Sequence, residues 1–252
     1  MIFLDFFSPD GVPVGVFSLT HLLVLIVCLF LIILCLFLIR NLNDNQINFM
    51  IKIIALTVLI LEIIKIIWNL RNGRKNLNTF VPLYFCSLFI YSSLLGVFGK
   101  GIVREAGYGF MFHGGLIGGL SFLVYPITSL KYFPMWHFIS FHSMLYHSLM
   151  VFVSLVLLFR NYRINKVGIR GFFVITFGFS LLAYLVNQID GSSNLMFLEK
   201  PVASLNLLWY VYDLSPKVYP FIFSILQNFG CFLVSFFIYK LFSKKKITIH
   251  NL

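Results

Sequence analysis

Cys86 and His147 are the two residues whose types could together do chemistry. A polar stripe runs down one face of the apolar segment that contains this histidine: Ser140, Ser143, His147 and Ser154. A histidine beside a cysteine can take the thiol proton, and the thiolate is a nucleophile that forms thioesters. Cys86 lies near the start of another apolar segment, just after Pro82. Buried histidines and cysteines are also common as inert interior residues, so the residues alone leave both interpretations open.

Other polar residues interrupt the apolar segments. Glu62, Lys65 and Asn69 follow a 3,4 spacing that places them on one helical stripe, where Glu62 and Lys65 can pair. Such a pair needs no catalytic role, and a structural ion pair between helices is the favoured interpretation. His142 is rotated by about 140° from His147 around a helix, so we expect it to face elsewhere. His113 is either a site residue or an interior hydrogen-bonding group.

The composition places most of the chain in a membrane. Of the 252 residues, 60% are hydrophobic and 11% are charged, which is too few polar side chains to cover a water-soluble fold. We expect an all-α fold: a single integral membrane domain over residues 1–252, with about seven transmembrane helices. The predicted helices lie near residues 17–39, 49–70, 81–98, 107–125, 136–159, 171–188 and 219–242.

Glycines in the fourth of these segments indicate close helix packing. They form two overlapping GxxxG patterns, made by Gly114, Gly115, Gly118 and Gly119. Small residues at this spacing let a neighbouring backbone approach closely.

The basic residues predict an orientation. The segment 160–170 and the cluster 244–246 are both rich in Lys and Arg, and cytoplasmic loops are enriched in these residues. Placing both in the cytoplasm of a cell-membrane protein puts the N-terminus outside, the C-terminus inside and the loop 188–219 outside. This arrangement conflicts with three basic residues that it leaves outside: Arg71, Arg74 and Lys75.

The charge and cysteine content exclude several classes of function. The net charge of +11 on a hydrophobic chain fits loops that face anionic lipid, and we expect no nucleic-acid partner. The four cysteines stand at unrelated spacings inside apolar runs, which fits neither a disulfide framework nor a zinc site. We expect no metal and no cofactor. Three of the cysteines are expected only to pack: Cys28, Cys35 and Cys231.

A second polar stripe lies on the sixth predicted segment. It consists of Ser180, Tyr184, Asn187 and Gly191, spaced 4,3,4. We expect this stripe to face the bundle interior and to lead to a loop, carrying Asn194 and Lys200, that shapes the entrance of a site. The residues expected to bind substrate are Tyr84, Asn187, Asn194 and Lys200.

Several short strings occur in one order along the chain. They are 17–22 (FSLTHL), 81–86 (VPLYFC), Phe133-Pro134 with His137 and His147, Asn187 with Gly191, and 194–201 (NLMFLEKP). Together they cover most of the chain. In this order the set resembles the bacterial YwaF-type membrane proteins, which are similar to a eukaryotic transmembrane acyltransferase acting on ether phospholipids.

The resemblance implies an activity. The family's cysteine and histidine fall on Cys86 and His147, so the resemblance implies a thiol and base pair. It implies an enzyme that moves a fatty acyl chain between membrane lipids, which serve as donor and acceptor. The chain departs from the pattern at Tyr84, where the family often has His, and at Ser87, where an acid is common. A third group that orients His147 is therefore not identified.

A small-molecule transporter or channel without catalysis is the alternative. Interior polar groups of a helical bundle can also line a pathway, and the chain offers Glu62, Lys65, His113, His147, Asn187 and Gln227. Transporters often contain paired halves, and the sequence has no such internal symmetry. A non-catalytic scaffold is the third possibility.

Overall fold

The computed structural model describes residues 6–8, 11–74, 76–160, 164–202 and 206–249, and it describes side chains up to residue 242. Helices make up 77% of the chain, and no strand occurs among the described residues, so the all-α class is confirmed. The elements are α2 (Leu19–Leu38), η1 (Ile39–Asn41), α3 (Asp44–Arg71), α4 (Leu77–Phe80), α5 (Leu88–Phe98), α6 (Gly101–Val124), α7 (Phe138–Phe159), α8 (Lys166–Asp190), η2 (Leu195–Phe197), α9 (Asn206–Leu214) and α10 (Tyr219–Ile249).

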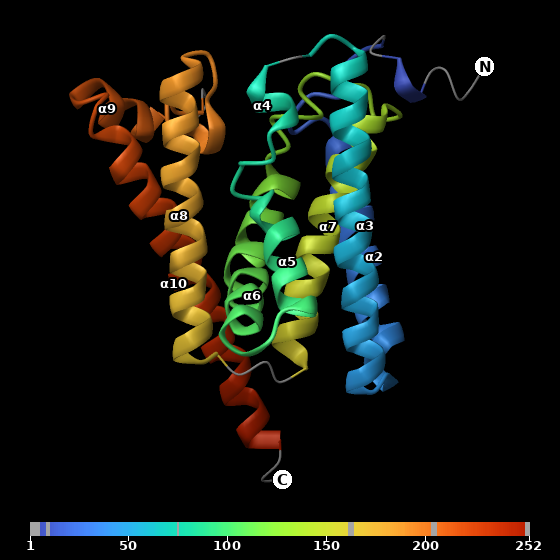
Figure 1. Cartoon of the computed structure of the whole chain (residues 1–252). Helices are drawn as coiled ribbons and strands as arrows, with labels where there is room; N and C mark the ends of the chain where they lie inside the picture. The colour runs from blue at the N-terminus through green and yellow to red at the C-terminus, as the bar shows by residue number, and fades with distance from the viewer. Residues whose placement is uncertain (1–5, 9–10, 75, 161–163, 203–205, 250–252) are drawn as a thin grey trace.

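The long helices run side by side along one direction (Figure 1). Within the described residues, five helices are long and apolar enough to cross a membrane: Leu19–Asn41, Gly101–Val124, Phe138–Phe159, Lys166–Asp190 and Tyr219–Phe242. α5 has 11 residues, fewer than the roughly 20 that a crossing needs, and the 28-residue α3 carries both Glu62 and Lys65. The number of seven crossings therefore stays a prediction.

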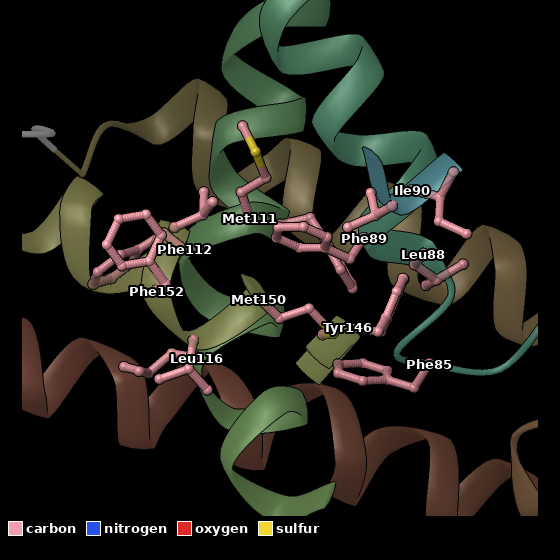
Figure 2. Packing of buried hydrophobic residues seen from close by; sticks show 14 of the residues in the cluster. Phe85, Leu88, Phe89, Ile90, Met111, Phe112, Leu116, Tyr146, Met150 and Phe152 are labelled. Carbon is pink, nitrogen blue, oxygen red and sulfur yellow. The ribbon is translucent and has the colours of Figure 1, made fainter. Parts of the chain in front are cut away.

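α6 is the central helix of the bundle. It packs against α5, α7, α8 and α10, while α3 packs on α5 and α7, and α2 packs on α7. α2 fully buries only His21 and Ile32, and most of its other apolar side chains are exposed, as expected for a helix in contact with lipid. Figure 2 shows the core between α5, α6 and α7, where Phe89, Met111 and Met150 are fully buried.

Glycines on α6 allow this close packing. A Cβ on Gly107 would collide with the backbone of Gly96 and Ser92 on α5. A Cβ on Gly119 would lie 3.0 Å from the backbone oxygen of His147 on α7, so a side chain there would force the two helices apart. The packing role predicted for the glycines is confirmed.

Several helices begin elsewhere than predicted, and for two of them the local reason is clear. α8 begins at Lys166, not 171, because the Asn165 side chain accepts a hydrogen bond from the Gly168 N–H (2.7 Å) and caps the helix. The helix predicted from residue 81 begins only at Leu88. Pro82 disfavours helical backbone at Val81, which is extended. Residues 81–87 therefore form a non-helical segment that contains Cys86.

The two predicted cytoplasmic segments lie at the same end of the bundle. The end of α7, the start of α8 and the C-terminal end of α10 lie together in Figure 1, opposite the end that carries the N-terminus and α4. Arg160 at this end donates hydrogen bonds to the backbone oxygens of Ile39 (2.5 Å) and Arg40 (3.0 Å). Arg71 and Arg74 lie at the opposite end, and Lys75 falls outside the described residues.

Replacement of Gly107 tests the close packing of α5 on α6. We expect Gly107→Ala to destabilise the protein by about 1–3 kcal/mol or more, because the added methyl group meets backbone that cannot rotate away. The matched control is Gly178→Ala on α8, where a Cβ meets nothing within 4 Å and alanine favours the helix. Thermal unfolding of both variants in detergent is the measurement. Equal melting temperatures would contradict the packing account.

Candidate functional site

A cavity of about 560 Å³ lies between α3, α6, α7 and α10. The segment 81–87 and the loop around residues 196–202 complete its wall. Exposed residues at the α4 end of the bundle, including Arg74 and Tyr132, also border it, so the cavity opens at that end. The polar and titratable side chains that line it include Glu62, Lys65, Tyr84, Cys86, Ser87, Ser121, His142, Ser143, Tyr146, His147, Gln227 and Cys231.

Cys86 borders the cavity from the non-helical segment that precedes α5. Its Sγ–H donates a weak hydrogen bond to the Gly118 backbone oxygen (3.7 Å), and the Tyr146 hydroxyl donates to the Cys86 backbone oxygen (3.0 Å). Both contacts hold the segment against α6 and α7. Non-helical backbone is tolerated inside an apolar bundle only where it is buried in protein or lines a cavity, and this segment does both.

His147 presents a free nitrogen. Its Nδ1 lies 2.7 Å from the Ser143 backbone oxygen, which can only accept, so Nδ1 carries the proton and Nε2 carries the lone pair. Nε2 is buried and makes no hydrogen bond within the described part of the chain. The ring stacks flat on Phe122, with centroids 3.6 Å apart and an interplanar angle of 6°. Ser143 and Phe122 together fix both the tautomer and the ring plane.

Cys86 and His147 contact neighbouring turns of α6. The thiol bonds to Gly118 and the imidazole stacks on Phe122, which is four residues later and therefore about 6 Å further along the helix. The two side chains thus border one region of the cavity. The thiol hydrogen bond goes to Gly118, and no bond between Sγ and Nε2 is present among the described contacts. A direct contact requires rotation of the Cys86 side chain.

The ion pair predicted on α3 is present and lies in the cavity wall. Lys65 Nζ is 2.6 Å from Glu62 Oε1, and Glu62 is buried. His142 Nε2 lies 3.8 Å from Glu62 Oε2, so His142 also borders the cavity. As predicted, His142 points in another direction than His147, but it still borders the cavity. α7 has more than one interior face, because it is surrounded by α2, α3 and α6 and is buried on nearly all sides.

Three other predicted polar residues lie outside the cavity, and two of them have structural partners. Ser154 donates to the Met111 backbone oxygen on α6 (2.6 Å), and His113 Nδ1 bonds to Ser235 Oγ on α10 (2.6 Å). Ser140 is buried but does not border the cavity. Of the predicted stripe on α7, only Ser143 and His147 therefore belong to the site.

The four residues expected to bind substrate divide between the cavity and the loop. Tyr84 lines the cavity. Asn187 is buried on α8, where its amide bonds to both the N–H (2.8 Å) and the oxygen (3.1 Å) of Leu195. Asn194 accepts bonds from the N–H groups of Glu199 and Lys200, and Lys200 is exposed. These asparagines shape the loop, whose Met196, Phe197 and Val202 reach the cavity.

Several site residues were not found by sequence reasoning. They are Phe122, Tyr146 and Cys231, which line the cavity from α6, α7 and α10, where Gln227, expected to be an interior polar residue, also lies. Phe122 and Tyr146 resemble dozens of other aromatic residues in the chain, and nothing local marks them. Cys231 was expected only to pack, but it borders the same cavity as Cys86, whereas Cys28 and Cys35 do not.

The fold and the cavity define a class: a multi-pass helical membrane protein with a mostly apolar cavity inside the bundle that contains a thiol and several polar groups. Residues 16–239 match the model of the TMEM164 family, a family of transmembrane proteins, and the chain belongs to that family. No curated protein and no solved structure matches the chain significantly. The family match carries no activity with it.

Tyr146→Phe tests the anchor of the Cys86 segment. Loss of the hydroxyl removes the hydrogen bond to the Cys86 backbone oxygen, so we expect the protein to lose about 1 kcal/mol of unfolding free energy. Tyr84→Phe is the matched control, since no described hydrogen bond involves the Tyr84 hydroxyl. The measurement is thermal unfolding in one detergent. Equal stability of the two variants would show that the anchor contributes nothing.

Proposed function

We propose that the protein is a membrane-embedded acyltransferase that moves a fatty acyl chain between lipids through Cys86 and His147. The observation that carries the proposal is that the Cys86 thiol and the His147 ring, which has an unpartnered nitrogen, contact adjacent turns of α6 and line one cavity. The resemblance to YwaF-type proteins supports the same pair. Family membership alone gives a transmembrane protein.

The proposed reaction has two halves. In the first, His147 Nε2 takes the Cys86 proton, the sulfur attacks the ester carbonyl of a donor lipid, and the carbon–oxygen bond of the ester breaks. The lysolipid leaves with a proton, and the acyl chain remains on Cys86 as a thioester. In the second half, the hydroxyl of an acceptor lipid attacks the thioester, and the proton it loses returns to the sulfur. Protons and charge balance over the cycle.

The position of Cys86 assists the thiolate. Cys86 stands two residues before the first residue of α5, so the N-terminal end of this helix faces the backbone next to the sulfur. The partial positive charge of a helix N-terminus stabilises an adjacent anion. The Ser143 backbone oxygen, which holds His147 Nδ1, takes the place of the third, orienting group, for which Tyr84 and Ser87 provide no acid.

The cavity suits a lipid ester. Its volume of about 560 Å³ falls in the range typical of small-molecule sites. Its inner wall combines aromatic side chains such as Phe85 and Phe122 with the thiol, and its open end carries polar groups such as Asn78 and Thr79. A lipid can therefore place its ester near Cys86 with its head group toward the opening. Exclusion of water protects a thioester from hydrolysis.

We infer that the protein is a cell-membrane protein with seven crossings, an outer N-terminus and a cytoplasmic C-terminus. Arg40, Lys100, Arg104 and Arg160 lie at the end of the bundle assigned to the cytoplasm, which follows the positive-inside rule. Arg71 and Arg74 break the rule, and the contacts of Arg74 give a reason for its position. Its guanidinium lies 4.8 Å from the Phe133 ring centroid and 5.2 Å from that of Trp68, at the cavity opening.

Mass spectrometry of the purified protein after incubation with isotope-labelled phospholipid tests the acyl transfer. We expect a labelled acyl group on the peptide that contains Cys86. Cys86→Ala should abolish transfer, His147→Ala should slow it by about 10²–10⁴-fold, and the double variant should be little worse than Cys86→Ala. The matched control is Cys35→Ala, an exposed cysteine outside the cavity. Normal transfer by Cys86→Ala would overturn the mechanism and favour the alternative that the protein is a transporter without catalysis.

Cysteine labelling in intact cells tests the orientation. In a variant without native cysteines, we expect Ser192→Cys to react with a membrane-impermeant maleimide from outside, because exposed Ser192 lies at the end that carries the N-terminus. Asn45→Cys, exposed at the opposite end, should react only after permeabilisation. The reverse pattern would invert the topology, and labelling of both from outside would contradict the crossing count.

A further inference from the structure

A second buried histidine borders the cavity, and the thiol and base pair does not use it. His142 is 4% exposed, and neither of its ring nitrogens makes a hydrogen bond among the described residues. A buried imidazole without partners is costly unless something else, such as a ligand, completes its hydrogen bonds. Because the ring faces the cavity, a bound molecule can reach it.

The groups around His142 make it a competent acid and base. Glu62 Oε2 lies 3.8 Å from Nε2, and Glu62 Oε1 is paired with Lys65. The His142 ring also lies nearly parallel to that of Tyr146, at 15° and 5.8 Å between centroids. The Glu62 carboxylate is therefore close enough to orient the His142 ring, while Tyr146, whose hydroxyl holds Cys86, packs against it.

The two histidines serve different sides of the cavity. His142 and His147 are five residues apart on α7, which separates them by about 140° around the helix. His147 lies against α6, where the thiol is, and His142 lies toward Glu62 on α3. A substrate ester bound between these walls can present its carbonyl carbon to the sulfur and its alcohol oxygen to the α3 side.

We propose that His142 is the catalytic acid and base at the lipid alcohol oxygen, with Glu62 as its positioning residue. The inference rests on the proposed acyl transfer. When the acceptor hydroxyl attacks the Cys86 thioester, its proton passes to His142, the new carbon–oxygen bond forms and the carbon–sulfur bond breaks. The His142 imidazolium then returns this proton to the Cys86 thiolate through His147, and both imidazoles end neutral. Acylation by a donor lipid is the same sequence in reverse.

Because His142 and His147 have separate roles, variants of the two residues should differ in their kinetics. A lysolipid leaving group needs a proton, whereas p-nitrophenolate leaves as an anion without one. A variant that lacks His142 should therefore acylate Cys86 slowly from a phospholipid and normally from a p-nitrophenyl ester. A variant that lacks His147 should be slow with both donors, because the thiol proton must leave in either case.

The experiment measures the rate at which the acyl group appears on Cys86, by mass spectrometry of the full chain in detergent. The two donors are diacyl phosphatidylcholine and p-nitrophenyl oleate. We expect His142→Asn to be about 100-fold slower than the wild type with the phospholipid and within about twofold of it with p-nitrophenyl oleate. The matched control is His113→Asn, a buried histidine bonded to Ser235 outside the cavity, which should react normally with both donors.

Each outcome decides a different point. Normal rates for His142→Asn with both donors would show that His142 is a spectator. Slow rates with both donors, repeated in His142→Gln, would make it a structural residue or part of thiol activation, and either result overturns the proposal. If the wild type forms no acyl-Cys86 from either donor, the proposed acyl transfer fails first. The p-nitrophenyl rate also reports whether each variant retains a folded site.

Discussion

The close approach of α6 to its neighbours is the constraint on which the rest of the structure depends. Gly107 brings α5 against α6, and Gly119 brings α7 against α6, at distances that leave no room for a side chain. Because the backbones are this close, a backbone oxygen of α6 at Gly118 can receive the Cys86 thiol. One turn later, Phe122 can lie flat under His147. The central helix therefore positions both reactive groups.

The second constraint is the cost of polar groups in an apolar bundle. The seven residues before α5 leave the helical pattern, and polar backbone in such a place must find partners or face a cavity. The Tyr146 hydroxyl donates a hydrogen bond to the Cys86 backbone oxygen, and the other side of the segment lines the cavity. The polar side chains of α3 and α7 gather at the same place, where Glu62, Lys65 and His142 compensate one another. The cavity is thus where the polar groups of several helices meet.

The sequence predicted the helices well, because apolar length is a strong local signal. It also predicted the Glu62 and Lys65 pair, since both residues lie on one helix and helical spacing decides the contact. Pro82 disfavours helical backbone before it and so indicates that the third predicted helix begins late. The apolar run around Pro82 nevertheless suggested a helix from residue 81. The site itself depended on contacts between helices. Sequence spacing could not show that α7 is enclosed on nearly all sides, so it did not place His142 at the cavity, and it gave no reason to bring Cys231 of α10 there.

The central claim is that His147 acts directly on the Cys86 thiol, and the rate of thiol alkylation tests it without any lipid substrate. A small apolar haloacetamide can enter the cavity and react with the thiolate, so the rate reports how readily Cys86 loses its proton. The measurement is the rate of Cys86 alkylation at neutral pH in the wild type and in His147→Ala. The account predicts at least a tenfold slower reaction in the variant, with exposed Cys35 reacting equally in both proteins. An unchanged rate at Cys86 would show that the two side chains do not act as a pair.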